Sequence, residues 1–273
     1  MRYPAVAGSF YTSSASNLRA EIEGYLSKVS PKVQKRKILA IVSPHAGYMY
    51  SGRCAAYSFA ACSNWSSRNL TAVIIGPNHT GMGSPISVSF DDWKTPLGEV
   101  KCDLELAGEI VKAGKIASRD EVAHFREHSC EVQLPFLQIC APSAKAVCIC
   151  MGWQDSASAQ DLGKAIFESV KKTRREAVVI ASSDFTHYES AESARKKDMM
   201  AISMILDMDW VGFEEFVETK NLSICGHGPI AAALHYSKLF NAKRCELLHY
   251  TNSGEASGDF ENVVAYAAIA IGK

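Results

Sequence analysis

The sequence predicts one α/β domain over residues 1–273, with a mostly parallel central sheet that carries helices on both faces. Short apolar segments alternate with segments in which apolar residues recur at helical spacing, a pattern typical of parallel sheets. The short segments are apolar throughout rather than at every second position, which indicates strands buried on both faces. No break in composition divides the chain, so we expect a single domain.

The expected strands are rich in apolar and branched residues, as in KILAIVS and TAVIIG. In chain order they span 37–43, 71–76, 85–89, 145–151, 176–182, 245–250 and 262–271. The first helix is expected to begin at a cap formed by Ser16 or Asn17, with apolar residues at helical spacing from Leu18 to Val29. The further expected helices span 53–62, 103–113, 129–140, 157–172, 192–208, 211–219 and 229–240.

The charge balance excludes some classes of partner. Lys and Arg together number 29, as do Asp and Glu, so nothing points to nucleic acid or to an anionic membrane. No apolar stretch is long enough to span a bilayer, and residues 1–14 lack the apolar core of a signal peptide. We therefore expect a cytoplasmic protein that binds neither nucleic acid nor a membrane.

The nine cysteines are an odd number and form no Cys-x-x-Cys pair. This spacing argues against a zinc ribbon and against a dense disulfide framework. Most of them lie in apolar surroundings, where cysteine behaves as a small apolar residue.

Polar residues follow three of the expected strands. His45 follows the strand at 37–43, His79 follows the strand at 71–76, and Asp184 and His187 follow the strand at 176–182. Ligands of open α/β sheets bind in the crevice beyond the carboxyl ends of the strands. A single histidine after a strand is more often a hydrogen-bonded turn residue, but three strand ends with the same pattern indicate a site.

Two histidines at neighbouring strand ends point to a metal ion, since imidazole suits iron, copper, zinc or nickel. The candidates for a third ligand are Asp184, His187, Glu131 and Cys225. The pair Cys225 and His227 is also compatible with a metal-free thiol dyad. There is no G-x-S-x-G elbow or P-loop, and GPNHTGMG does not match the dinucleotide-binding spacing.

The stretch HFREHSCEVQLPF places His128 and Glu131 at the start of an expected helix. Ser129 can cap this helix, with Glu131 as local charge, or Glu131 can contact a metal ligand or a substrate. Both interpretations stay open. His124, His235 and His249 follow no strand end of this kind and are interpreted as structural or surface residues.

Six motifs together resemble the Memo proteins, which occur in eukaryotes, archaea and bacteria. They are VAGSFYTSS, SPHAGYMYSG, GPNHTG, EHSCEVQLPF, SSDFTHY and ICGHGPI, and they cover nearly the whole chain in the family's order. The resemblance implies the fold of the class III extradiol ring-cleaving dioxygenases, which hold Fe(II) with two histidines and one carboxylate.

Carried over motif by motif, the resemblance implies a metal site of His45, His79 and Cys225, with Fe(II) as the first expectation and copper or zinc as alternatives. It places Asp184 and His187 in the same pocket, with His187 as an acid or base. The human-type motif reads Cys-Gly-Arg-His-Pro, so His227 stands where that motif has Arg, and we assign it no family role. His128 and His227 are expected as further groups of the pocket.

The resemblance leaves three functions open. The first is O₂-dependent oxidation of a small molecule by a non-haem metal enzyme, although a thiolate in place of a carboxylate means that ring cleavage does not follow from the fold. The second is a non-catalytic protein that binds a peptide or phosphate. The third is a partner of a radical SAM protein, because microbial Memo genes often lie beside a gene for one.

Overall fold

The computed structural model describes residues 1–29, 37–62, 65 and 70–273. Within them, nine strands form one mixed sheet and two further strands form a hairpin, β4 (Trp93–Thr95) with β5 (Gly98–Val100). The nine strands are β1 (Ile38–Ser43), β2 (Leu70–Pro77), β3 (Ile86–Val88), β6 (Ala117–Arg119), β7 (Lys145–Met151), β8 (Glu176–Ser182), β9 (His187–Glu189), β10 (Arg244–Asn252) and β11 (Val263–Gly272). The predicted α/β fold with a mostly parallel, mixed sheet is confirmed.

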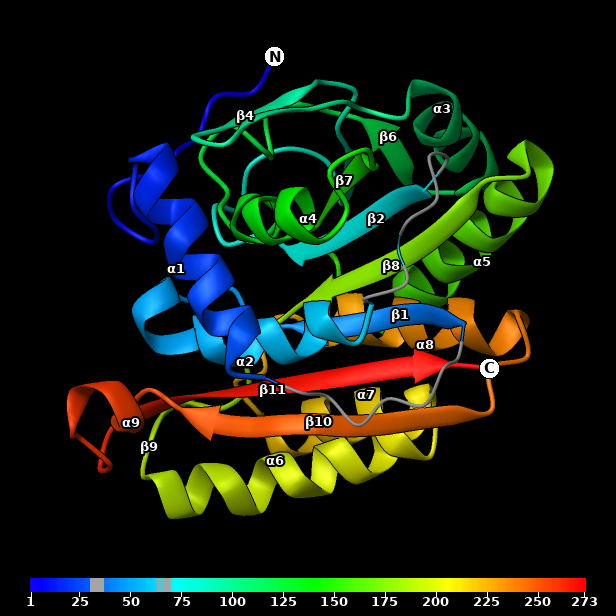
Figure 1. The fold of residues 1–273 in the computed structure, drawn as a ribbon. Coiled ribbons are helices and arrows are strands. Elements are labelled where there is room, and N and C mark those ends of the chain that lie inside the picture. Colours follow the sequence, from blue (N-terminus) through cyan, green and yellow to red (C-terminus); the bar gives the residue numbers. More distant parts are fainter. Residues whose placement is uncertain (30–36, 63–64, 66–69) are drawn as a thin grey trace.

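The sheet has the strand order β10-β11-β1-β8-β2-β7-β3-β6, and β9 pairs separately with β11. Strands β1, β8, β2 and β7 run parallel to one another at its centre. The two strands closest to the carboxyl end of the chain run antiparallel, since β11 pairs in this way with both β1 and β10. Figure 1 shows β11 lying between these two partners.

The helices form two layers, one on each face of the sheet. The helices α1 (Ala15–Ser27), α2 (Tyr48–Ala60) and α4 (Leu134–Cys140) pack together on one face. The other face carries α3 (Leu104–Ala113), α5 (Ser156–Thr173), α6 (Ala191–Leu206), α7 (Trp210–Lys220) and α8 (His227–Leu239). A short helix, α9 (Gly254–Ser257), joins β10 to β11.

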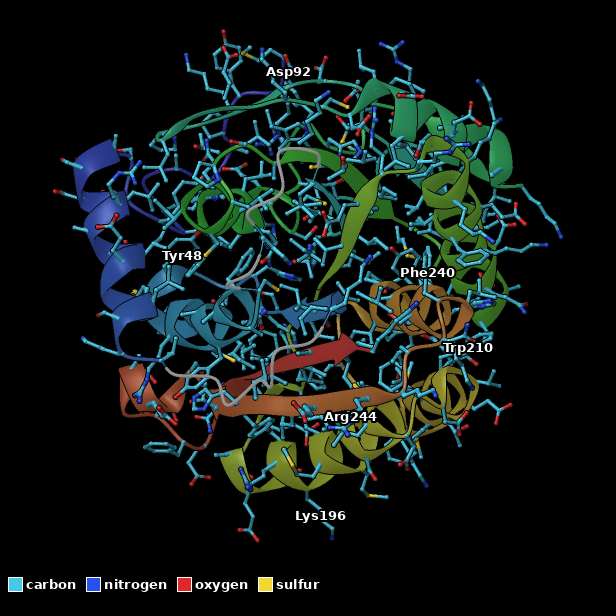
Figure 2. The ribbon with its side chains drawn as sticks, turned by 45° about the vertical axis from the view of Figure 1, so that its right-hand side comes forward. Tyr48, Asp92, Lys196, Trp210, Phe240 and Arg244 are labelled. Carbon is cyan, nitrogen blue, oxygen red and sulfur yellow. The ribbon has the colours of Figure 1, made fainter. Side chains whose placement is uncertain are left out.

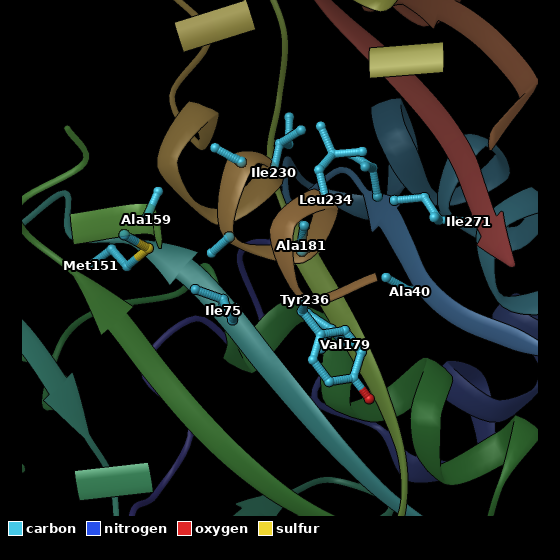
Figure 3. Close-up of a cluster of buried hydrophobic side chains, with 14 of the residues drawn as sticks. Ala40, Ile75, Met151, Ala159, Val179, Ala181, Ile230, Leu234, Tyr236 and Ile271 are labelled. Atoms are coloured by element: carbon cyan, nitrogen blue, oxygen red, sulfur yellow. The ribbon is translucent and has the colours of Figure 1, made fainter. Parts of the chain in front are cut away.

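Both faces of the sheet are packed, which explains the continuously apolar strands. Ile230 and Leu234 of α8 lie against Ala181 of β8 and Ile271 of β11 in the larger core cluster (Figure 3). All of these side chains are buried. Full burial of an aliphatic side chain contributes roughly 1.5–3 kcal/mol to the stability of the fold, so these contacts hold helix α8 on the sheet.

The second core cluster lies on the other face and includes Tyr48, at the first residue of α2. Tyr48 is buried, whereas Lys196 points from α6 into solvent (Figure 2). Within the described residues, no helix combines the length and the apolar character needed to cross a membrane.

Several element boundaries differ from those predicted. Helix α1 is capped by Ser14, whose Oγ accepts a hydrogen bond from Asn17 N, rather than by Ser16 or Asn17. Helix α2 begins at Tyr48 instead of residue 53, because the turn after β1 leads directly into it. The segment predicted as a helix over 129–140 contains a 3₁₀ turn (Glu131–Gln133) followed by α4. The short strands β4, β5, β6 and β9 were not predicted, because three residues are too few for a periodic signal.

Candidate metal centre

Three parallel strands bring the predicted residues to one edge of the sheet. Ser43 at the end of β1 lies opposite Ser182 at the end of β8, and β8 also pairs with β2. The segments that follow these strands therefore begin side by side, as the sequence predicts. The segment after β1 carries His45, and that after β2 carries His79.

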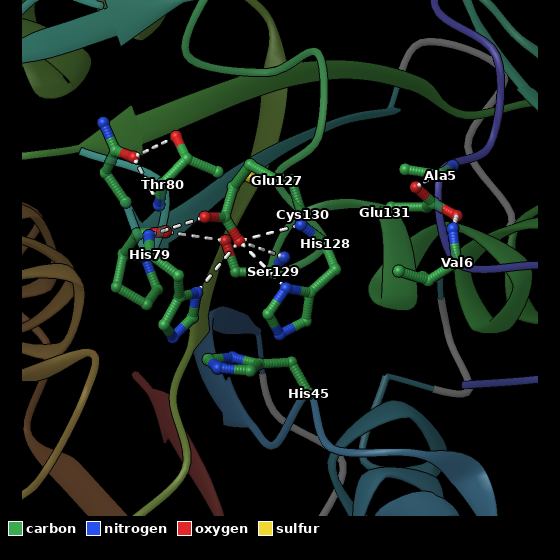
Figure 4. Close-up of polar contacts among 12 residues, drawn as sticks. Ala5, Val6, His45, His79, Thr80, Glu127, His128, Ser129, Cys130 and Glu131 are labelled. Atoms are coloured by element: carbon green, nitrogen blue, oxygen red, sulfur yellow. Dashed lines mark hydrogen bonds and ion pairs between the residues drawn. The ribbon is translucent and has the colours of Figure 1, made fainter. Parts of the chain in front are cut away.

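Three imidazole rings meet at this edge: His45, His79 and His128. Each ring offers one nitrogen, and these three atoms all lie within 4.8 Å of one another. The centroid of the His45 ring lies 5.2 Å from that of His79 and 5.5 Å from that of His128. Figure 4 shows the three rings facing a common centre. This group of side chains could hold a metal ion.

The side chain of His45 is fixed in one tautomer by Ser182. The Oγ of Ser182 donates its single hydrogen to the carbonyl of Ser129 and accepts a hydrogen bond from Gln133 Nε2. It lies 2.9 Å from His45 Nδ1 and can only accept there, so Nδ1 carries the hydrogen. Burial, followed by the neighbouring imidazoles His128 and His79, holds the pKa of His45 well below its ordinary value. His45 is therefore neutral, with the lone pair on Nε2.

Glu127 orients His79 from behind. Its carboxylate accepts hydrogen bonds from His79 N at 2.6 Å and His79 Nδ1 at 3.0 Å, and from the backbone N–H groups of His128 and Ser129 at 2.8 Å each. Burial acts to raise the pKa of Glu127, but these hydrogen bonds outweigh it and lower the pKa to about 2. An ionised carboxylate only accepts, so His79 Nδ1 donates and Nε2 is left for a ligand.

The sequence-based prediction missed Glu127, although it directly precedes His128 in the motif EHSCEVQLPF. Glu127 could have been predicted from chemistry, because histidines that bind a metal usually donate their second ring N–H to a carboxylate or carbonyl.

His128 was predicted in the pocket and lies in the imidazole cluster. Its ring stacks on that of His79, with centroids 4.7 Å apart, and contacts Phe10 from the N-terminal segment. Its Nδ1 lies 3.4 Å from the Glu127 carboxylate, farther than the corresponding atom of His79. Burial, the largest cause, lowers the pKa of His128, so this ring is also neutral.

The sulfur of Cys225 lies 3.3 Å from His45 Nε2, outside the group of three imidazoles. The backbone N–H of Asp184 points at the sulfur from 3.3 Å. Burial, followed by the charge of Asp184, raises the pKa of the Cys225 thiol well above its ordinary value. The side chain of Gln154 holds the Cys225 segment by donating to its carbonyl and accepting from Gly228 N.

Asp184 and His187 both line a pocket that opens over the three imidazoles. Asp184 Oδ1 accepts a hydrogen bond from His45 N at 2.8 Å, and burial raises the pKa of this carboxyl to about 6. His187 Nδ1 lies 2.8 Å from the carbonyl oxygen of Ser223, which can only accept. Nδ1 therefore carries the hydrogen in the neutral ring, and Nε2 is free to accept a proton.

Two candidate residues have other partners. His227, the first residue of α8, pairs with the buried Glu214 of α7 at 3.0 Å and is absent from the pocket lining. Glu131, a candidate third ligand, instead uses its carboxylate to bind Arg2, the backbone N–H groups of Ala5 and Val6, and Tyr11 Oη. Figure 4 shows the Glu131 carboxylate beside Ala5 and Val6. It therefore anchors the N-terminal segment.

The pocket has a volume of about 590 Å³, a size that suits a small organic ligand. Besides the three imidazoles, it is lined by the N-terminal segment, the start of α2, the segment after β8 and the connection from β10 to β11. A second cavity of about 550 Å³ lies between α3 and α5, at the exposed Trp153. It contains none of the candidate site residues.

The fold and this edge together define an α/β protein with a histidine-rich candidate metal centre. A family model described as Memo-like protein matches residues 2–270. MEMO1 family proteins of Methanosarcina acetivorans and Methanocaldococcus jannaschii are 46% and 44% identical, over 99% and 98% of both chains respectively. The chain belongs to the Memo family, as its motifs predict.

A structural comparison agrees on the fold. The crystal structure of an uncharacterized protein from Escherichia coli K12 is similar, with a TM-score of 0.56 and 12% sequence identity. The match covers 85% of this chain and 99% of that one.

Proposed function

We propose that this protein binds one transition metal ion through His45, His79 and Cys225, and that it uses the ion to oxidise a small molecule with O₂. The observation that carries the proposal is the placement of the ring hydrogens. His45 donates from Nδ1 to Ser182, and His79 donates from Nδ1 to Glu127, so both Nε2 atoms are left for a ligand. This is the arrangement that supports histidine ligands in metal sites.

Cys225 is favoured over His128 as the third ligand for two reasons. Its sulfur already lies beside His45 Nε2, at 3.3 Å. His128 has only a 3.4 Å contact behind its Nδ1, whereas His45 and His79 each have a close partner there. We therefore assign His128 to the wall of the pocket, where it faces a substrate.

The donor set fits a metal ion chemically. Two imidazoles and a thiolate suit iron, copper or zinc, and we favour Fe(II) on the relation of the family to non-haem iron dioxygenases. When bound, the ion supplies Lewis acidity and, for iron or copper, the capacity to react with O₂. The buried thiol has a raised pKa, so the thiolate is stable only with a positive charge beside it.

Two further residues act on the substrate in this proposal. His187 Nε2 accepts a proton from a substrate hydroxyl, because Nδ1 is already committed to the Ser223 carbonyl. Asp184 holds the backbone N–H of His45 and presents its carboxyl to the same pocket, where it positions the substrate.

The test is metal content after anaerobic purification, measured by elemental analysis on the wild type and on five variants. We expect about one equivalent of iron in the wild type and in His128→Ala. In His45→Ala, His79→Ala and Cys225→Ser we expect the affinity for the metal to fall at least about tenfold, and the metal content to fall with it. His235→Ala is the control, since this residue lies on α8 outside the pocket lining. Unchanged metal content in His45→Ala and His79→Ala would refute the site.

A further inference from the structure

The pocket over the imidazoles has an unusual charge pattern. Its lining includes two carboxylates, Asp184 and Asp259, and, among the residues that the structure describes, no lysine or arginine. Pockets that take phosphate or carboxylate groups commonly supply arginine, lysine or clustered backbone N–H groups. Here the backbone N–H of His45, which opens the segment before α2, is already held by Asp184. Apart from the imidazoles, the lining of the pocket therefore disfavours an anionic ligand.

The walls of the pocket are aromatic. Phe10, Tyr50, Tyr188 and Tyr266 contribute to the lining, and they come from four separate segments of the chain. Tyr266 is buried, whereas Tyr188 is 76% exposed. Aromatic faces attract both flat rings and cations, and they attract anions poorly.

Tyr188 is held at the pocket in a conformation that costs free energy. Its φ is 58°, in the left-handed region that bulky side chains rarely adopt. The pairing of β9 with β11 on both sides of it, at His187 and Glu189, maintains this backbone. Such local strain concentrates at ligand sites, and here it keeps an exposed ring next to His187, with centroids 5.7 Å apart.

Asp259 places a fixed negative charge on the same lining. Its Oδ1 accepts hydrogen bonds from the backbone N–H groups of Glu261 and Asn262, at 2.9 and 3.3 Å. The residue is exposed, and among the residues that the structure describes, no lysine or arginine forms an ion pair with it. The carboxylate is therefore oriented by the backbone and is available to a ligand.

We propose that the pocket selects an aromatic molecule that carries a protonated amine. The ring packs among the aromatic walls, and the ammonium group lies at Asp259. Only the placement of the opposite end of the ligand, which faces the imidazoles, rests on the proposed function. The preference for positive charge comes from residues outside the metal ligands, so it holds for the metal-free protein as well.

The test compares three phenols that differ in the charge of one substituent. Tyramine is cationic, 4-ethylphenol is neutral and 4-hydroxyphenylacetate is anionic at pH 7.5. Binding is measured by titration calorimetry on the full chain, first without metal and then after loading with Fe(II) under nitrogen. We expect the metal-free protein to bind tyramine about tenfold more tightly than 4-hydroxyphenylacetate, with 4-ethylphenol between them.

A pair of variants assigns the preference to one residue. Asp259→Asn is expected to reduce the tyramine preference to about threefold or less. Glu261→Gln removes the same charge from the same segment outside the pocket lining, and it is expected to leave the preference unchanged. Equal or tighter binding of the anionic phenol by the metal-free protein, or no binding of tyramine, overturns the proposal. Loss of metal binding alone does not overturn the proposal, because metal content is measured separately.

Discussion

The hydroxyl of Ser182 accepts a hydrogen bond from His45 Nδ1 at 2.9 Å, and this contact decides which nitrogen of His45 faces the pocket. We predict that Ser182→Ala lowers metal affinity by about tenfold, because the ring loses the partner that fixes its tautomer and orientation. Competition with a chromogenic chelator measures the change.

The control for this variant is Ser43→Ala. Ser43 lies opposite Ser182 at the end of β1, and its buried hydroxyl has no hydrogen-bond partner among the described residues. Its removal is expected to leave metal affinity unchanged. An equal effect of both variants would mean that Ser182 acts through packing rather than through the hydrogen bond.

Glu127 is expected to make the stability of the metal-free protein depend on pH. Its folded pKa of about 2 lies below its ordinary value of 4.5, so its contribution is complete above the ordinary value and is lost as the pH falls toward the folded value. We predict that Glu127→Gln lowers the free energy of unfolding by roughly 3 kcal/mol at pH 7 and by less than half of that at pH 3.

Urea denaturation at the two pH values measures this dependence. Glu215→Gln, which replaces an exposed glutamate on α7, serves as the control and is expected to show no difference at either pH. A destabilisation by Glu127→Gln that is the same at pH 7 and pH 3 would contradict the assigned charge.

Glu131 and Arg2 form a buried ion pair, and loss of one partner should be severe. Their side chains are 0% and 5% exposed, so Glu131→Ala leaves the Arg2 charge buried without its partner. We predict a loss of roughly 3–5 kcal/mol in the free energy of unfolding. The double change Arg2→Met with Glu131→Met is expected to recover part of this loss, since it removes both charges. If the double variant loses as much stability as the two single variants together, Arg2 and Glu131 are not coupled.

Gly226 is required because its neighbours leave no space for a side chain. A Cβ atom there would lie 2.4 Å from the carbonyl oxygen of Ser182 and 2.6 Å from Ser183 Cβ. We predict that Gly226→Ala displaces Cys225, lowers metal content and costs roughly 1–3 kcal/mol of stability. Gly24→Ala is the control, since a Cβ at this position in α1 meets nothing within 4 Å and should stabilise the protein by about 0.5–1 kcal/mol.

The sequence was sufficient to predict the parallel centre of the fold and the edge at which the polar residues gather. Continuously apolar strands such as β2 and β8 carry their own signal, because burial on both faces excludes polar residues. The direction of β10 and β11 carries no such signal, since an apolar strand looks the same whether its neighbours run parallel or antiparallel. The antiparallel pairing of β11 with both β1 and β10 is set by tertiary packing.

The site was predicted in part for a similar reason. His45 and His79 follow strands directly, so their positions were visible in the sequence. His128 and Glu127 reach the site from a segment that follows no predicted strand, and its hydrogen bonds to Arg2 and His79, both distant in the chain, hold it there. The role of Glu131 could not be predicted, because its partners lie at least 120 residues away in the chain.

The position of β11 between β10 and β1 has a consequence for folding during synthesis. Of the described strands it leaves the ribosome last, yet it fills the place between β1 and β10. Until it emerges, β1 has an open edge that can pair with other chains. The connection that carries Asp259 precedes β11 directly, so the pocket is also unfinished on a nascent chain. Capture of a ligand in this pocket therefore has to wait until β11 has emerged and paired.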